Sequence, residues 1–180
     1  MKKEKSILLG VTASIAAYRA CDIITCLKKE GFDVVVCATR EALNFITPLT
    51  LQTLSRSRVF YEMFEPVADF NPTHISLAEK ADLVLIAPAT ADCISKLAAG
   101  ICDDIVTCTA VSTKAPILIA PAMNENMYNH KVVAANIVAL KKIGYKFIGP
   151  VKGHLACGHD AIGHIAPVQE IIKEVKKLIK

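Results

Sequence analysis

The sequence predicts a single α/β domain with a doubly wound parallel sheet, of the Rossmann-like or flavodoxin-like kind. Three observations lead to this fold class: short apolar runs alternate with helical patterns, the runs lack polar alternation, and 180 residues suit one domain. Parallel strands covered on both faces are expected to be continuously apolar. The expected strands are residues 6–11, 33–38, 82–87, 116–120 and 145–148. Right-handed crossovers should join them.

Two amphipathic helices are the clearest connecting elements. An apolar stripe predicts a helix that ends at Gly31, and its members are Ala16, Ala20, Ile23, Ile24 and Leu27. A second stripe predicts a closing helix over 168–179, with lysines on its solvated face. We expect residues 1–180 to form one domain, with a flap at about 153–165 before the closing helix.

Composition and charge exclude several classes of protein. Apolar residues make up 53% of the chain, which excludes intrinsic disorder and leaves apolar surface for contacts between subunits. The net charge of +4 is small and dispersed, so no nucleic-acid partner is expected. No run approaches the ~20 apolar residues of a membrane span, so no membrane association is expected.

The cysteines and the first residues bear on the compartment. Seven cysteines without a paired short spacing fit neither a disulfide framework nor a CxxC zinc site, which favours a reducing, cytoplasmic location. The opening segment superficially resembles a secretory signal. Thr12 and Ser14 interrupt its apolar run, however, and a helical pattern containing Arg19 and Asp22 follows. We therefore expect a cytoplasmic protein.

A ligand is expected just beyond the apolar runs, because open α/β sheets bind ligands at the carboxyl ends of their strands. Two of these tips share the pattern Leu-Ile-Ala-Pro-Ala, at 85–89 and 118–122, and we expect Pro to end each strand because it cannot donate to a ladder. The segments selected by this rule are 10–14, Thr39, 90–93, 123–126 and 153–164.

Three of these segments carry hydroxyls suited to an anion or a flat ring. Small residues at 10–14 would let backbone N–H groups and Ser14 approach a phosphate at a helix N-terminus, although neither a dinucleotide fingerprint nor a P-loop is present. Thr39 supplies a second hydroxyl nearby, and the segment that starts at Thr90 could bind the edge of a ring. The alternative is that Ser14 and Thr90 are ordinary helix N-caps.

Residues 121–128 place apolar side chains where a loop should be polar. Met123, Met127 and Tyr128 would cover a ligand, or the two methionines would fill core gaps while Asn124 caps a helix. His74 taken alone is best read as an ordinary surface or core imidazole, and this reading changes only if it shares a pocket with Asn124.

Glycines flank Cys157 and indicate a flap that can expose its thiol. The alternative is a metal site, whose spacing matches no common zinc pattern, built from His154, Cys157, His159 and His164. The cysteines in expected helices and strands are treated as small core hydrophobes: Cys21, Cys26, Cys37, Cys102 and Cys108.

Six segments taken together resemble the flavin-containing cysteine decarboxylase family, and in particular its branch in coenzyme A biosynthesis. They are 10–18, 45–49, 74–77, 87–91, 121–128 and 155–158, and the Pro-Ala-Met-Asn block is the most specific of them. The resemblance implies a carboxy-lyase that is a homotrimer or a dodecamer of trimers, with FMN bound between subunits and a small-molecule substrate. It implies His74 as the base, Asn124 as the ligand of the substrate carboxylate with Met127 and Ala156 beside it, and Cys157 as the proton donor. The implied FMN contacts are Ala13, Ser14, Ile15, Thr39, Thr90, Ala91, Asp92, Cys93 and Ala122.

The chemistry requires such a cofactor. Direct loss of CO2 from a cysteine carboxylate leaves an unstabilised carbanion, and no side chain of the chain offers an electron sink. Two departures from the family pattern stand out. The flap lacks a Gly at Ala161, and the chain ends without the fused synthetase domain of many bacterial homologues, so a separate phosphopantothenate–cysteine ligase would supply the substrate.

Three other functions stay open on the sequence. One is a peptidyl-cysteine decarboxylase of peptide-antibiotic maturation, although the Leu-Ala-Cys-Gly block at 155–158 argues against it because a reductive second half-reaction needs a proton donor there. Another is a flavin prenyltransferase, which would carry different residues at the active site. The third is a non-catalytic flavin-binding or regulatory protein.

Overall fold

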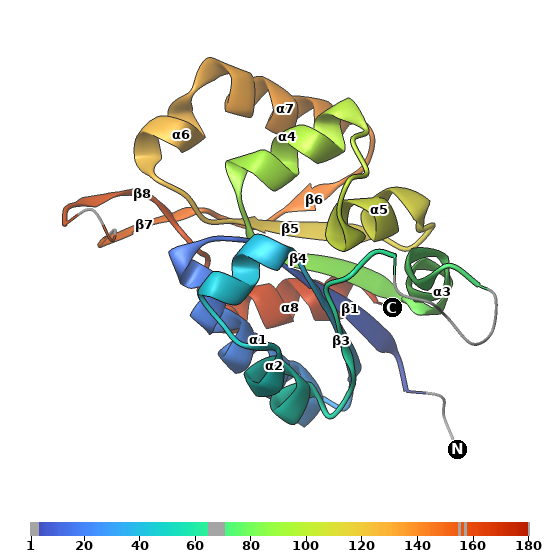
Figure 1. The fold of residues 1–180 in the computed structure, drawn as a ribbon. Coiled ribbons are helices and arrows are strands. Elements are labelled where there is room, and N and C mark those ends of the chain that lie inside the picture. The colour runs from blue at the N-terminus through green and yellow to red at the C-terminus, as the bar shows by residue number, and fades with distance from the viewer. Residues whose placement is uncertain (1–3, 65–70, 155, 157, 180) are drawn as a thin grey trace.

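The computed structural model describes residues 4–64, 71–154, 156 and 158–179, and its core is one parallel sheet (Figure 1). The six strands follow the order β3-β2-β1-β4-β5-β6, and all neighbours in the sheet are parallel. Their bounds are β1 (Ser6–Val11), β2 (Asp33–Ala38), β3 (Val59–Phe60), β4 (Leu83–Ala89), β5 (Ile117–Pro121) and β6 (Lys146–Phe147). The predicted α/β class with a parallel sheet is confirmed.

Helices cover both faces of this sheet (Figure 1). One face carries α1 (Arg19–Lys29), α2 (Pro48–Ser55) and α8 (Val168–Leu178). The other carries α3 (Thr73–Lys80), α4 (Ala91–Ala99), α5 (Ile105–Ser112) and α7 (Lys131–Lys142). The short elements are α6 (Glu125–Asn129) and the 3-10 helices η1 (Ile15–Tyr18) and η2 (Arg40–Asn44). In the described part of the chain, no helix combines the length and the apolar character that a membrane crossing needs.

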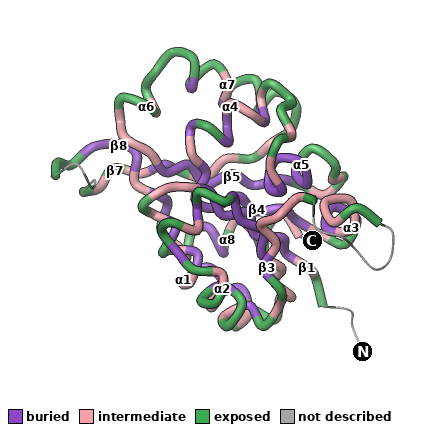
Figure 2. The backbone as a smooth tube through the Cα atoms, in the orientation of Figure 1, coloured by how far each residue is buried: buried purple, intermediate pink, exposed green. Residues whose placement is uncertain are grey.

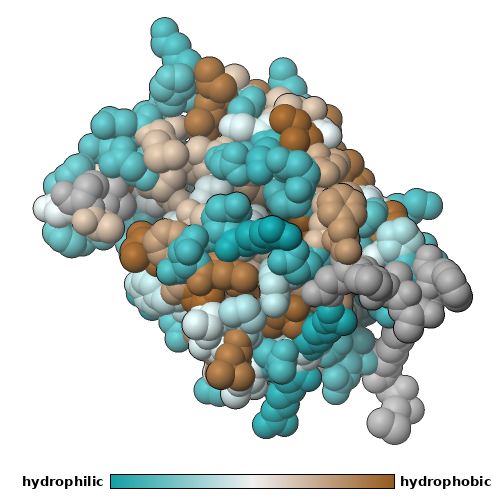
Figure 3. Space-filling view, viewed as in Figure 1, coloured by the Kyte–Doolittle hydropathy of each residue, from teal (hydrophilic) through white to brown (hydrophobic). Residues whose placement is uncertain are grey.

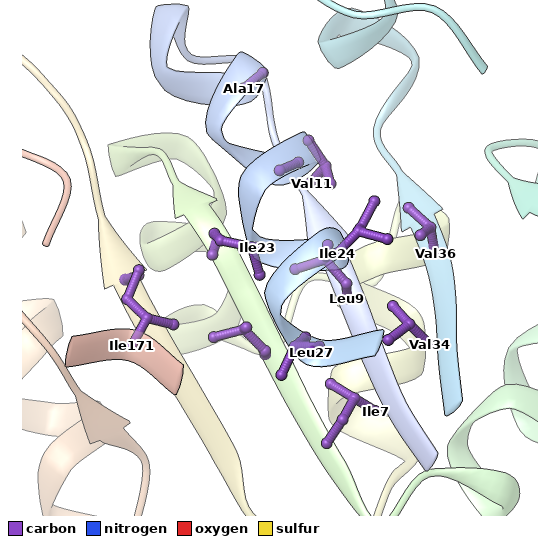
Figure 4. Close-up of a cluster of buried hydrophobic side chains, with 14 of the residues drawn as sticks. Ile7, Leu9, Val11, Ala17, Ile23, Ile24, Leu27, Val34, Val36 and Ile171 are labelled. Atoms are coloured by element: carbon purple, nitrogen blue, oxygen red, sulfur yellow. The ribbon is translucent and has the colours of Figure 1, made fainter. Parts of the chain in front are cut away.

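The two-residue period of the strands divides the core between the layers. In β1, Ile7 and Leu9 pack toward α1 and α8, while Leu8 packs toward the opposite layer. Figure 4 shows Ile23 and Ile24 of α1 over the sheet, and Figure 2 shows that the sheet is the most buried part of the chain. Since both faces are covered, β4 is buried at all seven positions, as its apolar sequence predicts.

Gly10 has a packing role that differs from the one expected for it. A Cβ built at this position would lie 2.9 Å from Cγ1 of Val106 in α5, so the glycine lets α5 approach β1 closely. Its missing side chain therefore makes room for a helix of the second layer, and the residue does not line the cavity described below.

The structure corrects several expected boundaries. Pro88 does not end its strand: β4 continues to Ala89, which pairs with Pro121, and the register shifts between Ile86 and Ala89. Such an irregularity accommodates a residue that has no N–H to donate. Likewise β5 includes Pro121, and the helix expected from Ala16 begins as the 3-10 turn η1 before α1.

Three of the strands were not predicted. The edge strand β3 has only two residues, too few for a periodic signal. The expected flap contains an antiparallel hairpin of β7 (Val151–His154) and β8 (Asp160–His164) (Figure 1). Among the cysteines expected in the core, Cys37 and Cys108 are buried, whereas Cys21, Cys26 and Cys102 are partly exposed.

Candidate functional site

A cavity of about 520 Å³ lies where β1, β4 and β5 end, and the β7–β8 hairpin forms part of its wall. This volume is within the range of small-molecule and cofactor sites. Five segments that are distant in sequence line it. The lining residues are Ala13, Ser14, Ile15, Ala16, Tyr18, Thr90, Ala122, Met123, Asn124, Met127, His154, Ala156, Gly163, His164 and Ile165.

A buried hydroxyl joins the ends of β1 and β4 behind this cavity. Oγ1 of Thr12 donates to the carbonyl of Pro88 at 2.8 Å and accepts from the backbone N–H of Thr90 at 3.0 Å. Thr12 is almost completely buried, so its bonds do not compete with water. This joint fixes the loop before α4 relative to the loop after β1.

Replacing Thr12 with Val should therefore destabilise the protein. Val has a similar shape but no hydroxyl, and the Thr90 N–H would lose this partner inside the protein. We expect the free energy of unfolding in urea to fall by about 1–3 kcal/mol. The matched control is Thr53→Val, which removes an exposed hydroxyl of α2 that donates at 2.7 Å to the carbonyl of Leu49. It should change stability by less than about 0.5 kcal/mol. If the two variants lost the same amount of unfolding free energy, the structural role of the Thr12 hydrogen bonds would be contradicted.

Further bonds tie the other walls of the cavity together. Oγ of Ser14 donates to the carbonyl of Ala122 at 3.3 Å, which links the loop after β1 to the end of β5. The backbone N–H of Met123 donates to the carbonyl of Gly163 at 3.1 Å, which links the end of β5 to β8. The cavity wall is thus continuous from β1 to the hairpin.

Three predicted polar residues cap helices and also line the cavity. Ser14 caps η1, Thr90 caps α4 by accepting from Cys93 N at 3.2 Å, and Asn124 caps α6 by accepting from Asn126 N at 2.9 Å. Since Oδ1 of Asn124 accepts this bond, the amide NH2 is the group that can donate to an anion. The capping and ligand-binding interpretations are therefore compatible.

The cavity offers neutral polar groups in a largely apolar wall. Among the described residues that line it, none is an Asp, Glu, Lys or Arg. Nδ1 of His164 donates to the carbonyl of Ile165 at 2.8 Å, so this histidine carries a proton on Nδ1. Hydroxyls, an amide and starts of helices suit a ligand that combines a flat ring with a phosphate.

Several sequence-predicted residues meet at this cavity and others do not. The predicted contacts that line it are Ala13, Ser14, Ile15, Thr90, Ala122, Asn124, Met127 and Ala156. Thr39 caps η2 and lies next to the end of β1, where its N–H donates to the Val11 carbonyl at 3.0 Å. Asp92 forms an ion pair with Lys96 at 3.3 Å. Neither these two nor Ala91 and Cys93 are among the lining residues.

The thiol of Cys93 points into the core. Burial, together with the nearby carboxylates of Asp104 and Asp92, raises the pKa of this thiol above its ordinary value. Burial likewise raises the pKa of the Cys37 thiol to about 12. Both thiols are therefore protonated at neutral pH, and a contribution of Cys93 to ligand binding would come from its backbone.

His74 lies apart from Asn124. It is in the first turn of α3, which packs against α5, and it does not line the cavity. Its Nδ1 is buried and has no hydrogen-bond partner within the described part of the chain. Within one chain, therefore, these two predicted residues do not share a pocket.

Sequence reasoning missed three residues that line the cavity: Ala16, Tyr18 and Ile165. Ala16 and Tyr18 lie in segment 10–18, which carries part of the family resemblance, so the sequence did contain a signal for these two residues. Cys157, the predicted proton donor, lies outside the described residues.

The alternative metal site is not assembled by the residues that can be described. His154 pairs with Asp160 at 3.2 Å, His159 pairs with Glu125 at 2.9 Å, and His164 binds a backbone carbonyl. Over residues 4–64, 71–154, 156 and 158–179, no group of three or more His, Cys, Asp or Glu side chains is placed to hold a metal ion.

Comparison with known proteins points to one family. The model of the family described as Flavoprotein matches residues 1–180. The chain is 43% identical over 175 residues to a probable phosphopantothenoylcysteine decarboxylase of Streptococcus mutans, with 96% of this chain and 98% of the relative covered. It is 42% identical to the coenzyme A biosynthesis bifunctional protein CoaBC of Bacillus subtilis, covering 98% of this chain but 44% of that protein. The chain thus spans less than half the length of the bifunctional relatives.

Solved structures share the fold over nearly the whole chain. A mutant PPC decarboxylase complexed with pantothenoylaminoethenethiol has a TM-score of 0.88 at 27% identity, and 97% of this chain and 98% of that one are covered. The FMN-dependent cysteine decarboxylase SpaF gives a TM-score of 0.85 at 26% identity, with 94% of each chain covered. The fold described above is therefore that of solved decarboxylases.

Proposed function

Because the chain belongs to the Flavoprotein family, we propose that it is an FMN-dependent carboxy-lyase that converts 4′-phospho-N-pantothenoylcysteine to 4′-phosphopantetheine in coenzyme A biosynthesis. The observation that carries the proposal is the cavity at the ends of β1, β4 and β5, where Ser14, Thr90 and Asn124 meet. Relatives at 42–43% identity with names from this pathway support the substrate. The substrate is an amide of cysteine, so an amide-forming phosphopantothenate–cysteine ligase must act before it.

The residues present fit FMN. The lining combines apolar side chains with neutral donors at the starts of η1 and α4, which suit a flat ring and a phosphate. Ala13, Ser14, Ile15, Thr90 and Ala122 would hold the cofactor, with Thr39 and the backbone at 91–93 beside them. Bound FMN would supply the two-electron sink that this chemistry requires, by taking two electrons from the substrate before CO2 is lost and giving them back afterwards.

The side chains of this chain then move protons and orient the substrate. His74 takes the thiol proton, so that the adjacent carbon can be oxidised to a thioaldehyde; the carboxylate is then β to C=S and leaves as CO2. Asn124 orients that carboxylate through its amide. A fixed positive charge would instead stabilise the ground-state anion that has to disappear. Cys157 protonates the resulting enethiolate, and the thiol product leaves the site.

The separation of His74 from Asn124 is consistent with a site formed between copies of the chain. We infer a homotrimer, or a dodecamer of trimers, in which His74 of one copy faces the cavity of another. Large apolar side chains of the cavity wall are exposed, among them Ile15 at 60% and Met127 at 47%. Figure 3 shows apolar side chains interrupting the hydrophilic surface on this face of the molecule. Burying such side chains would stabilise an oligomer.

Two measurements test the proposed function. Freshly purified protein, or protein reconstituted with FMN, should show the absorption bands of bound flavin. It should then release CO2 from phosphopantothenoylcysteine and form the saturated thiol. Failure to bind FMN, or absence of CO2, would refute the proposal. Turnover only of a peptide with a C-terminal cysteine, ending at the enethiol, would assign the alternative activity.

Replacing Cys157 with Ser should separate the two half-reactions. Ser is a far weaker acid than Cys, so the enethiolate would not be protonated efficiently, while thiol oxidation and CO2 loss would proceed. We expect FMN to stay bound, one equivalent of CO2 per site to be released, and formation of the saturated thiol to fall by at least about 100-fold. Mass spectrometry of the products checks this. A normal yield of the saturated thiol would remove Cys157 from the mechanism.

A further inference from the structure

The β7–β8 hairpin is attached to the rest of the molecule by a side-chain contact with α6. Nε2 of His159 lies 2.9 Å from Oε1 of Glu125, although the two residues are 34 positions apart in the sequence. The side chains are 52% and 33% exposed, so the pair lies at the surface and remains in contact with water.

The location of this pair matters because of its neighbours. Glu125 directly follows Asn124 and begins α6, the helix that also carries Met127 of the cavity wall. His159 lies on the hairpin just before β8, and the chain between β7 and β8 includes Cys157. The pair therefore connects the two segments from which the proposed carboxylate ligand and proton donor come.

A second contact attaches the other end of β8. The N–H of Met123 donates to the Gly163 carbonyl, close to the start of α6. The charged groups near His159 on its own hairpin are Asp160 and His154, which pair with each other at 3.2 Å. On the facing helix α6, Glu125 provides a carboxylate that contacts His159. This contact and the Met123–Gly163 hydrogen bond together hold β8 along α6.

We propose that Glu125 and His159 are positioning residues that hold the hairpin against α6 while substrate occupies the cavity. The inference rests on the proposed function. Breaking the pair leaves the hairpin on its Met123 contact and lowers the population of the attached state.

The expected size of the effect follows from the exposure of the pair. Ion pairs on protein surfaces shift equilibria by up to about fivefold. If only the attached state binds substrate well, its apparent dissociation constant rises as that state becomes rarer, while saturating substrate restores the attached state. Glu125→Gln should therefore raise KM about two- to fivefold and leave kcat within about twofold.

A double-mutant cycle tests the contact. Glu125→Gln should raise KM in the parent protein but not in the His159→Gln background, because the interaction that it removes is already absent there. The matched control is Glu174→Gln, which breaks an exposed pair with Lys177 on α8 and should leave KM unchanged. FMN content should be normal in all four proteins. Factors that multiply in the double variant, or an unchanged KM in the single variants, would overturn the proposal.

Hydrogen exchange gives a readout that does not depend on turnover. Amides of residues 151–164 should exchange about two- to fivefold faster in Glu125→Gln than in the parent FMN-loaded protein, and not in Glu174→Gln. If the parent protein is inactive but this difference appears, the proposed function fails and the contact stands. If the parent is active and the exchange rates are identical, the contact fails and the proposed function stands.

Discussion

The variant His74→Asn is expected to bind FMN and to release CO2 at least 100-fold more slowly than the parent protein. Asn preserves a polar side chain of moderate size but cannot accept and hold the thiol proton as an imidazole can, and positioned acid–base groups contribute about 10²–10⁴ in rate. The buried Nδ1 without a partner among the described residues supports a role that one chain alone does not satisfy. The rate of CO2 release, measured in a timed assay, tests the loss of activity, and the absorption spectrum of bound flavin tests FMN binding.

The control replaces a histidine that has a structural role. Nδ1 of His130 accepts from Val132 N at 3.3 Å as the N-cap of α7, and Asn is a good N-cap, so His130→Asn should keep full activity. Mixed oligomers of His74→Asn and Asn124→Ala chains should recover part of the activity, because some sites would combine intact residues from different copies. Unimpaired turnover by His74→Asn would remove this residue from the mechanism.

The second large effect is expected for Gly163→Ala. Gly163 has φ of +139°, and a Cβ there would lie 2.1 Å from the Met123 carbonyl oxygen, which belongs to the backbone and cannot rotate away. The added methyl group must displace β8 from Met123 and break their hydrogen bond. We expect kcat/KM to fall at least about tenfold, since a displacement of about 1 Å in a catalytic site can cost 10²-fold.

Two measurements separate displacement of β8 from backbone strain. The amide of Met123 should lose its protection from hydrogen exchange in Gly163→Ala. Gly31→Ala is the control, because Gly31 also has a positive φ, of +82°, but a Cβ there meets nothing within 4 Å. It should lower stability by about 1–2 kcal/mol and leave the Met123 amide and turnover unchanged. Retained protection in Gly163→Ala would contradict the predicted displacement.

The sheet could be predicted because its signal is local. Ile7, Leu9 and Leu85 belong to apolar runs that identify buried parallel strands whatever their partners are. The continuation of β4 through Pro88 could not be predicted, because it depends on the pairing of Ala89 with the next strand. The two residues of β3 likewise form a strand only because β2 lies beside them.

The cavity edge could also be predicted, since the ends of parallel strands meet. Ser14, Thr90 and Asn124 line one cavity for this reason. The direction in which individual side chains point was harder to predict from the sequence. Cys93 follows Thr90 by less than one turn of α4, and yet its side chain points into the core. The contact between His159 and Glu125 could not be foreseen, because it depends on where the hairpin lies on α6.

Because five distant segments of the chain form the cavity wall, a ligand can bind there only when the whole domain is folded. Its members extend from Ala13 to Ile165, so about 150 residues of chain must be in place before the wall exists. A partly folded intermediate would have no recognition surface to offer. A ligand held there would stabilise only the finished molecule, and the colour of a flavin would then report cooperative assembly of the entire domain.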